Sequence, residues 1–220
     1  MTGTNHRSKL PLGQRVVVRA LDLYIRAAYR VIAPFNEDYV RTFGAWEYVK
    51  WMLEAERIRA LLERRYGKTE TQMLISMAGL LSGCRWCSIQ HMLLANLMIF
   101  EQTGELGPVD ELDLPRWQEM RDAEVLEVLE ESLQPRWSHI VPVLRRLYEL
   151  RAGLAEPSTD DDYLLVRTNV MWEWAIECTI TALDFDPASI PPFGPMARDR
   201  TLFTRYRNAR AEHRSGPTPD

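Results

Sequence analysis

The stretch TQMLISMAGLLSGCRWCSIQH, residues 71–91, decides the fold and the chemistry of this 220-residue chain. Its first half, MLISMAGLL, is apolar on every side of a helix, and a helix of that kind is buried. Ser82 and Gly83 break this helix, and a second helix is predicted over about 84–101. The sequence therefore predicts a central pair of helices joined at a turn just before Cys84.

The rest of the chain is also helical in its spacing of apolar residues. The predicted helices cover 14–32, a short segment from Asn36, 45–66, a short segment that opens at Asp113-Leu114-Pro115, 123–133, 135–150, 160–183 and 197–213. No hairpin signal lies between alternating runs, so the predicted fold class is all-α. Residues 13–214 are expected to form one domain, and 1–12 and 215–220 are expected to be disordered tails.

Composition excludes several classes of protein. With 27 Lys and Arg against 31 Asp and Glu, the formal net charge is −4, which gives no footprint for nucleic acid. No apolar run reaches the roughly 20 residues of a membrane span, and the N-terminus lacks the apolar core of a signal peptide. Three cysteines are too few for a secreted disulfide framework. We therefore expect a cytoplasmic protein with no nucleic-acid or membrane partner.

Two cysteines and a histidine share one face of the second central helix. Cys84, Cys87 and His91 follow the pattern C-x2-C-x3-H, so at about 100° per residue they lie within about 60° of one another. Both thiols fall in the first turn, where free N–H groups and the helix dipole favour the thiolate. This pattern favours a thiol–disulfide redox site.

Two other interpretations of these residues stay open. Cysteine is often a small buried residue without chemistry. Cys84, Cys87 and His91 are also suitable zinc ligands, but the sequence holds no second CxxC or HxxxH pair, and Cys178 would join them only through the tertiary fold. The absence of GxGxxG and P-loop patterns leaves nucleotide cofactors unsupported. We therefore predict neither a cofactor nor a metal.

Residues 72–91 resemble the signature of the AhpD-like (alkylhydroperoxidase D-like) branch of the carboxymuconolactone decarboxylase family. That signature has Glu, eleven residues, CxxC, three residues and His, and Gln72 stands here at the Glu position. The resemblance implies an AhpD-like helical bundle that is oligomeric. It also implies that Cys87 attacks a peroxide substrate, that Cys84 resolves the sulfenic acid to a disulfide, and that His91 takes part in a proton relay. A dithiol protein or a small thiol would supply the electrons.

Gln72 is where this chain departs from the signature. Glutamine can orient His91 but cannot take up a proton at neutral pH. Another carboxylate would then complete the relay, and Glu173 and Glu177, in the apolar run MWEWAIECTI, are the candidates, since at least one is expected to be buried. Cys178 beside them is interpreted as a core residue.

Two further segments bear on the site. The charged residues of helix 45–66 are interpreted as a solvated face (Glu54, Glu56, Arg57, Arg59, Glu63, Arg64). The Trp-rich helix 163–183 and the Pro-rich stretch after it are expected to form a pocket wall or lid. The predicted function is a thiol-dependent peroxidase or disulfide oxidoreductase. The alternatives are a non-redox decarboxylase- or isomerase-like enzyme of the same family, or a helical interaction module with structural or zinc-bound cysteines.

Overall fold

The computed structural model describes residues 10–30, 35–176 and 185–216. These residues form helices and connecting turns, with no strand among them, which confirms the all-α prediction. The helices are α1 (Leu12–Tyr29), α2 (Asn36–Phe43), α3 (Ala45–Tyr66), α4 (Lys68–Leu81), α5 (Arg85–Thr103), α6 (Leu114–Trp117), α7 (Asp122–Leu133), α8 (Val141–Arg151), α9 (Asp160–Ile176) and α10 (Arg200–Ser215), with 3-10 turns η2 (Pro187–Ser189) and η3 (Gly194–Arg198).

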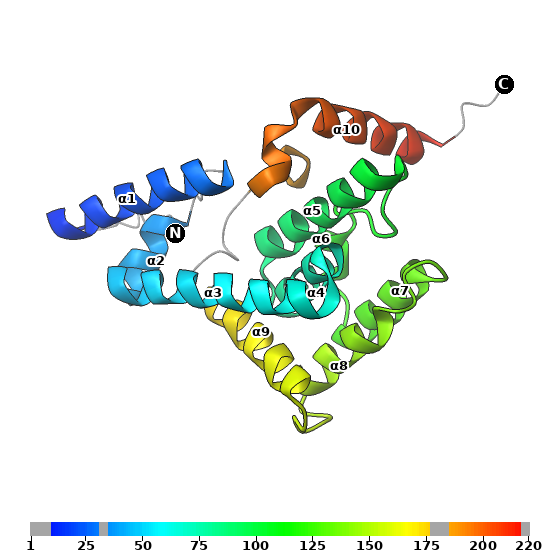
Figure 1. The fold of residues 1–220 in the computed structure, drawn as a ribbon, viewed down its shortest axis with the longest axis horizontal. Helices are drawn as coiled ribbons and strands as arrows, with labels where there is room; N and C mark the ends of the chain where they lie inside the picture. Colours follow the sequence, from blue (N-terminus) through cyan, green and yellow to red (C-terminus); the bar gives the residue numbers. More distant parts are fainter. Residues whose placement is uncertain (1–9, 31–34, 177–184, 217–220) are drawn as a thin grey trace, which may run out of the picture.

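Helices α4 and α5 form the central pair, and the other helices surround them (Figure 1). Every residue from Thr71 to Leu81 is buried, as expected for a helix that is apolar on all sides. The two helices approach closely at Gly79, where an added Cβ would lie 3.1 Å from the Cβ of Cys87 and 3.1 Å from the Ser88 nitrogen. Glycine at this position therefore allows the start of α5 to pack directly on α4.

The surrounding helices cover this pair from different sides. Helix α3 packs on α4 and α9, α8 packs on α4 and α9, and α10 lies along α5 (Figure 1). Their apolar faces join one continuous core, and full burial of a large apolar side chain contributes about 1.5–3 kcal/mol. The packing fixes the start of α5 within the core of the molecule.

Three residues show how the helices near the central pair begin and end. Gly67 ends α3 with φ 99° and ψ 163°, so it is extended with positive φ rather than left-handed helical, and α4 begins at once with Lys68. Thr69 is therefore inside α4 and does not cap it. Pro142 lies in the first turn of α8 and causes no kink, because the segment before Val141 forms turns instead of helix.

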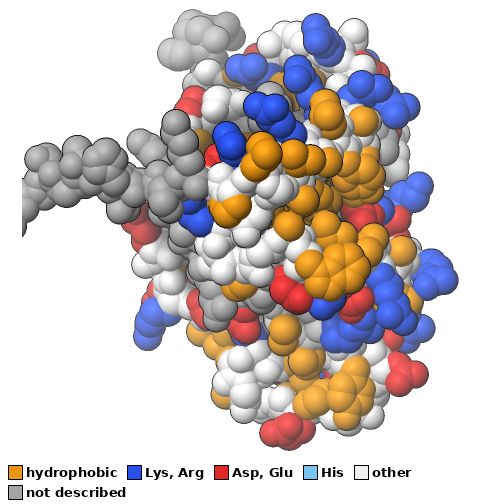
Figure 2. Space-filling model, turned by 90° about the vertical axis from the view of Figure 1, so that its left-hand side faces the viewer, with side chains coloured by type: hydrophobic (Ala, Val, Ile, Leu, Met, Phe, Trp, Pro, Cys, Tyr) orange, Lys and Arg blue, Asp and Glu red, His pale blue; other side chains and the backbone are white. Residues whose placement is uncertain are grey.

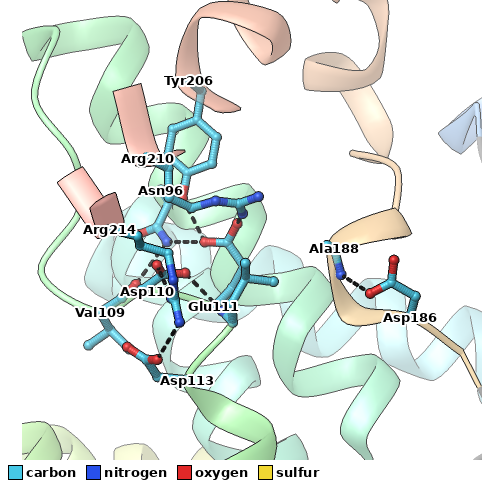
Figure 3. Close-up of polar contacts among 11 residues, drawn as sticks. Asn96, Val109, Asp110, Glu111, Asp113, Asp186, Ala188, Tyr206, Arg210 and Arg214 are labelled. Carbon is cyan, nitrogen blue, oxygen red and sulfur yellow. Dashed lines mark hydrogen bonds and ion pairs between the residues drawn. The ribbon is translucent and has the colours of Figure 1, made fainter. Parts of the chain in front are cut away.

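A buried carboxylate attaches the C-terminal helix to the core (Figure 3). Glu111 is 1% exposed and accepts hydrogen bonds from Asn96 Nδ2 at 2.8 Å and Tyr206 Oη at 2.6 Å. It also pairs with the Arg210 guanidinium. Burial raises the pKa of the Glu111 carboxyl, and the Arg210 charge acts in the opposite direction. Each polar contact of this carboxylate comes from the protein itself.

One face of the molecule presents apolar side chains to solvent. Figure 2 shows hydrophobic groups gathered on the face that carries α1 and α3. Several are more than half exposed (Leu12, Val16, Leu23 and Tyr24 on α1; Trp46 and Leu53 on α3). Exposed apolar patches are typical of contact surfaces, and the predicted oligomer stays a prediction. Among the described residues, no helix combines the length and the hydropathy that a membrane crossing requires.

The predicted tails lie largely outside the described residues. At the N-terminal end, Leu10 is buried and α1 begins at Leu12, inside the segment predicted to be a tail. At the C-terminal end, α10 continues to Ser215. The described part of the chain therefore begins and ends in helices that pack on the core.

Candidate redox site

The turn between α4 and α5 sets the position of the first cysteine. Gly83 has φ 78°, a value that side chains disfavour, and it reverses the chain after α4. The Cys84 nitrogen then donates to the Gly79 carbonyl at 2.8 Å, and the Cys84 carbonyl accepts the first hydrogen bond of α5 from Ser88. Cys84 is therefore the N-cap of α5, and the helix itself begins at Arg85, one residue after the predicted start.

Cys84 and Cys87 are joined by a disulfide, with their Cα atoms 5.3 Å apart. The Cys87 backbone N–H also points to the Cys84 sulfur, at 3.3 Å. Cys84 is 0% exposed, whereas Cys87 keeps part of its surface accessible. Cys87 is therefore the partly exposed residue of the pair, and Cys84 is enclosed by the protein. Both sulfurs lie at the positive end of the α5 dipole, which favours a thiolate once the bond is reduced.

His91 lies one helical turn after Cys87 and contacts Gln72, as the signature spacing suggested. His91 Nδ1 is 2.7 Å from Gln72 Oε1. Because a carbonyl oxygen only accepts, Nδ1 carries the proton in this arrangement, and Nε2 is the nitrogen with the free lone pair. The imidazole is held edge-on between Trp172 at 5.8 Å and Phe193 at 5.2 Å between ring centroids. The ring is thus fixed in one orientation.

Burial lowers the pKa of His91 from 6.5 to about 3, and the positive charge of Arg59 adds to this effect. An imidazolium would lose its hydration here, and the neutral amide of Gln72 offers no compensating charge. His91 is therefore uncharged at neutral pH. It can accept a hydrogen bond or a transient proton but does not hold one.

His91 lines a cavity of about 170 Å³ whose walls come from distant parts of the chain. Trp172 of α9 and Phe193 from the stretch between η2 and η3 form part of it, which confirms the predicted pocket wall. Glu56 and Arg59 of α3 also line it, so the charged side of α3 is not simply a solvated face. Arg59 bonds Glu56 at 2.6 Å and pairs with Glu63, and Tyr29 donates to Glu56.

The carboxylates predicted to complete the relay lie elsewhere or cannot be placed. Glu173 is exposed and pairs with Arg151, so it does not contact His91. Arg151 also donates to the Ser82 hydroxyl at 3.3 Å, which ties this ion pair to the turn before Cys84. Glu177 and Cys178 lie outside the described residues. Glu70, two residues before Gln72, pairs with His139.

The donor set does not form a metal site in this state. Both candidate thiolates are joined in the disulfide, and His91 is the third group. Across the part of the chain that the structure describes, no three His, Cys, Asp or Glu side chains are arranged to hold a metal ion. What the arrangement supports chemically is reversible oxidation of two thiols beside a neutral imidazole.

The sequence motif did not identify four residues that line the site: Tyr29, Glu56, Arg59 and Phe193. The motif spans only 72–91, and these residues reach it through tertiary packing of α1, α3 and the C-terminal segment. One signal was available: Glu56, Arg59 and Glu63 are spaced by three and four residues, beside the buried Ile58 and Leu62. Charged side chains next to buried residues of the same helix can line a cavity as well as contact solvent.

Comparisons of this chain with protein-family models, with curated proteins and with solved structures return no match. The family therefore remains unassigned, and the motif has to be interpreted from its own geometry. The described residues form a helical structure with a CxxC pair at disulfide distance. A neutral histidine lies one turn further along α5, and an aromatic cavity lies beside it.

Proposed function

We propose that this protein is a thiol-dependent oxidoreductase that reduces a peroxide through Cys87 and Cys84. The observation that carries the proposal is the Cys84–Cys87 pair at the start of α5, with Cys84 buried, Cys87 partly exposed and His91 one turn away. The same activity is implied by the resemblance of 72–91 to the AhpD-like signature. A close pair of thiols at a helix start suits reversible disulfide exchange.

The reaction begins with the reduced pair. The Cys87 thiolate attacks one peroxide oxygen, the O–O bond breaks, and the leaving oxygen takes a proton to become an alcohol or water. Cys87 is then a sulfenic acid. The Cys84 thiol attacks the Cys87 sulfur, the S–O bond breaks, and the hydroxide leaves as water with the Cys84 proton. The pair has lost two electrons, and an external dithiol returns them by thiol–disulfide exchange.

The assignment of roles follows from exposure and from helix position. Cys87 is partly accessible and can meet a substrate, whereas Cys84 is fully buried and can meet only Cys87. Cys87 also lies within the first turn of α5, where the N–H groups that have no intrahelical partner stabilise an anion. Cys87 is therefore the attacking residue and Cys84 the resolving residue.

His91 moves protons without carrying a lasting charge. The lone pair on His91 Nε2 is available because the proton is on Nδ1, which donates a hydrogen bond to Gln72 Oε1. Since burial lowers the pKa of His91 to about 3, a proton taken from a thiol passes on to the leaving oxygen instead of remaining on the ring. Gln72 acts here as a positioning residue that fixes the ring and its tautomer.

Peroxide consumption with dithiothreitol as the electron donor tests the proposal. We expect wild type and Cys178→Ser to turn over, and Cys87→Ser to lose at least about a hundredfold in rate, because no other thiolate replaces the nucleophile. In a separate reaction without dithiothreitol, pre-reduced Cys84→Ser should consume one equivalent and stop at a sulfenic acid that dimedone traps. Activity retained by Cys87→Ser would refute the assignment.

A further inference from the structure

We infer that the cavity beside His91 binds a neutral, single-ring organic molecule carrying one oxygen that accepts a hydrogen bond, and that Gln90 donates to that oxygen. As a binding site, the assignment stands on the cavity alone. As the site that selects the organic group of a substrate, it rests on the proposed function.

The walls of the cavity are mainly aromatic. Seven Phe, Tyr and Trp side chains line it, together with aliphatic groups from α1, α3 and α4 (Tyr29, Phe35, Tyr48, Trp51, Trp86, Trp172, Phe193). Several pack edge to face, including Phe35 on Trp86 at 6.3 Å between centroids. Such walls favour a flat ring, and an apolar cavity of about 150 Å³ is known to hold benzene. The volume of about 170 Å³ therefore fits a single ring with a small substituent.

Gln90 provides the polar group that faces this cavity. It is 8% exposed and lines the cavity, and its Oε1 accepts a hydrogen bond from Trp86 Nε1 at 2.9 Å. Because an indole N–H only donates, the amide orientation is fixed and Nε2 carries the hydrogens. Nε2 is buried and has no partner among the described residues. A buried donor without an acceptor is costly, and an acceptor oxygen on a ligand would remove that cost.

The charged side chains of the cavity wall already form ion pairs within the protein, which favours a neutral ligand. Arg59 pairs with both Glu56 and Glu63, and Tyr29 donates its hydroxyl to Glu56. Among the residues that line the cavity, these contacts leave no unpaired cation to attract a carboxylate ligand, and an anion would be placed near Glu56. Binding energy must then come from the rings and from the one free donor.

The site also lies next to the redox pair. Trp86, Gln90 and His91 line the cavity from the first two turns of α5, and Cys87 lies between them in the chain. A ligand held by Gln90 would therefore lie near the end of α5 that carries Cys87.

Titrations monitored by tryptophan fluorescence test the inference, because three tryptophans line the cavity. The probes are acetophenone, which has a ring and an acceptor oxygen; ethylbenzene, the same skeleton without oxygen; and benzoate, which is charged. With the disulfide intact, we expect acetophenone to bind about fivefold more tightly than ethylbenzene, the effect of one neutral hydrogen bond, and benzoate to bind most weakly.

Three variants make the result specific. Gln90→Met should abolish the advantage of acetophenone and leave ethylbenzene binding unchanged. Ala55→Phe, on the cavity wall, should block both neutral probes, whereas Ala60→Phe, exposed on the same helix, should block neither. Equal binding of acetophenone and ethylbenzene to wild type, equal weakening of both by Gln90→Met, or no binding of any probe would overturn the inference.

The same titration on Cys84→Ser/Cys87→Ser separates this inference from the proposed function. We expect acetophenone to bind this double variant as it binds wild type, because the cysteines do not line the cavity. Binding together with absent peroxide turnover by wild type would refute the redox proposal alone. Peroxide turnover without probe binding would refute the ligand site alone.

Discussion

Two buried polar sites in this molecule, one around Glu111 and one around His91, differ in whether their polar groups find partners within the protein. Glu111 is a carboxylate that meets the Arg210 charge and two further donors, so its charge and its lone pairs are satisfied within the protein. His91 is a neutral ring that meets a neutral amide, and nearby Gln90 keeps a buried N–H donor with no partner in the described chain.

This difference indicates which of the two sites stabilises the fold. The Glu111 cluster is complete without a ligand and holds α10 against α5 (Figure 3). The His91 cavity retains a basic nitrogen on His91 and an unused donor on Gln90, and the Cys84–Cys87 pair lies beside it on the same helix. Groups left open in this way are typical of a site that binds or reacts. The comparison assigns a structural role to Glu111 and a functional role to His91.

The largest expected effect comes from breaking the Glu111 cluster. Arg210→Met leaves a buried carboxylate without its counter-charge, and we expect a loss of about 3–5 kcal/mol in the free energy of unfolding. Arg207→Met, exposed on the same helix, should cost no more than about 1 kcal/mol. Urea denaturation of the two variants and wild type measures both values.

The pH dependence of the Arg210→Met effect has a definite sign. Without the Arg210 charge, only hydrogen bonds such as those from Tyr206 and Asn96 oppose the effect of burial, so the pKa of Glu111 rises further above 4.5. The folded variant then holds a proton that the unfolded chain has lost, so stability falls as pH rises through that raised pKa. The loss relative to wild type should be greater at about pH 8 than at about pH 5. A loss that is the same at both would show that Glu111 is not the affected group.

Local patterns predicted one part of the site well and long-range packing determined the rest. The apolar run before Ser82 and the glycine after it predicted a buried helix, a break and a new helix, and each is present. The contact between Gln72 and His91 followed from the signature spacing. By contrast, Glu56 and Phe193 reach His91 through the packing of α3 and the C-terminal segment, which no local spacing encodes. Glu173 failed as a buried candidate because Arg151 holds it at the surface.

A carboxylate at position 72 should give His91 a charged partner, as Arg210 is for Glu111. In Gln72→Glu a negative charge lies next to His91 Nδ1, and we expect the pKa of His91 to rise by about 1–3 units above its value of about 3. NMR titration of the histidine ring protons measures this shift. Peroxide turnover should rise if proton transfer limits the rate. An unchanged pKa would show that Gln72 and His91 do not interact in solution.

A smaller effect is expected on the acid stability of the wild-type protein. His91 has a folded pKa of about 3 and an unfolded value of 6.5, so the unfolded chain binds an additional proton between these values. Its contribution to stability is complete above pH 6.5 and declines as pH falls toward 3, with a slope of at most about 1.4 kcal/mol per pH unit. His91→Phe keeps an aromatic ring between Trp172 and Phe193, and it should show a shallower decline. Equal slopes in both proteins would contradict the pKa assigned to His91.

The most direct test of the central claim is a thiol count before and after peroxide. The fully reduced chain holds three cysteines. One equivalent of peroxide should lower the number of free thiols from three to one, with peptide mapping placing the new disulfide between Cys84 and Cys87. A count that stays at three after peroxide, or a disulfide that forms without Cys87, would contradict the account.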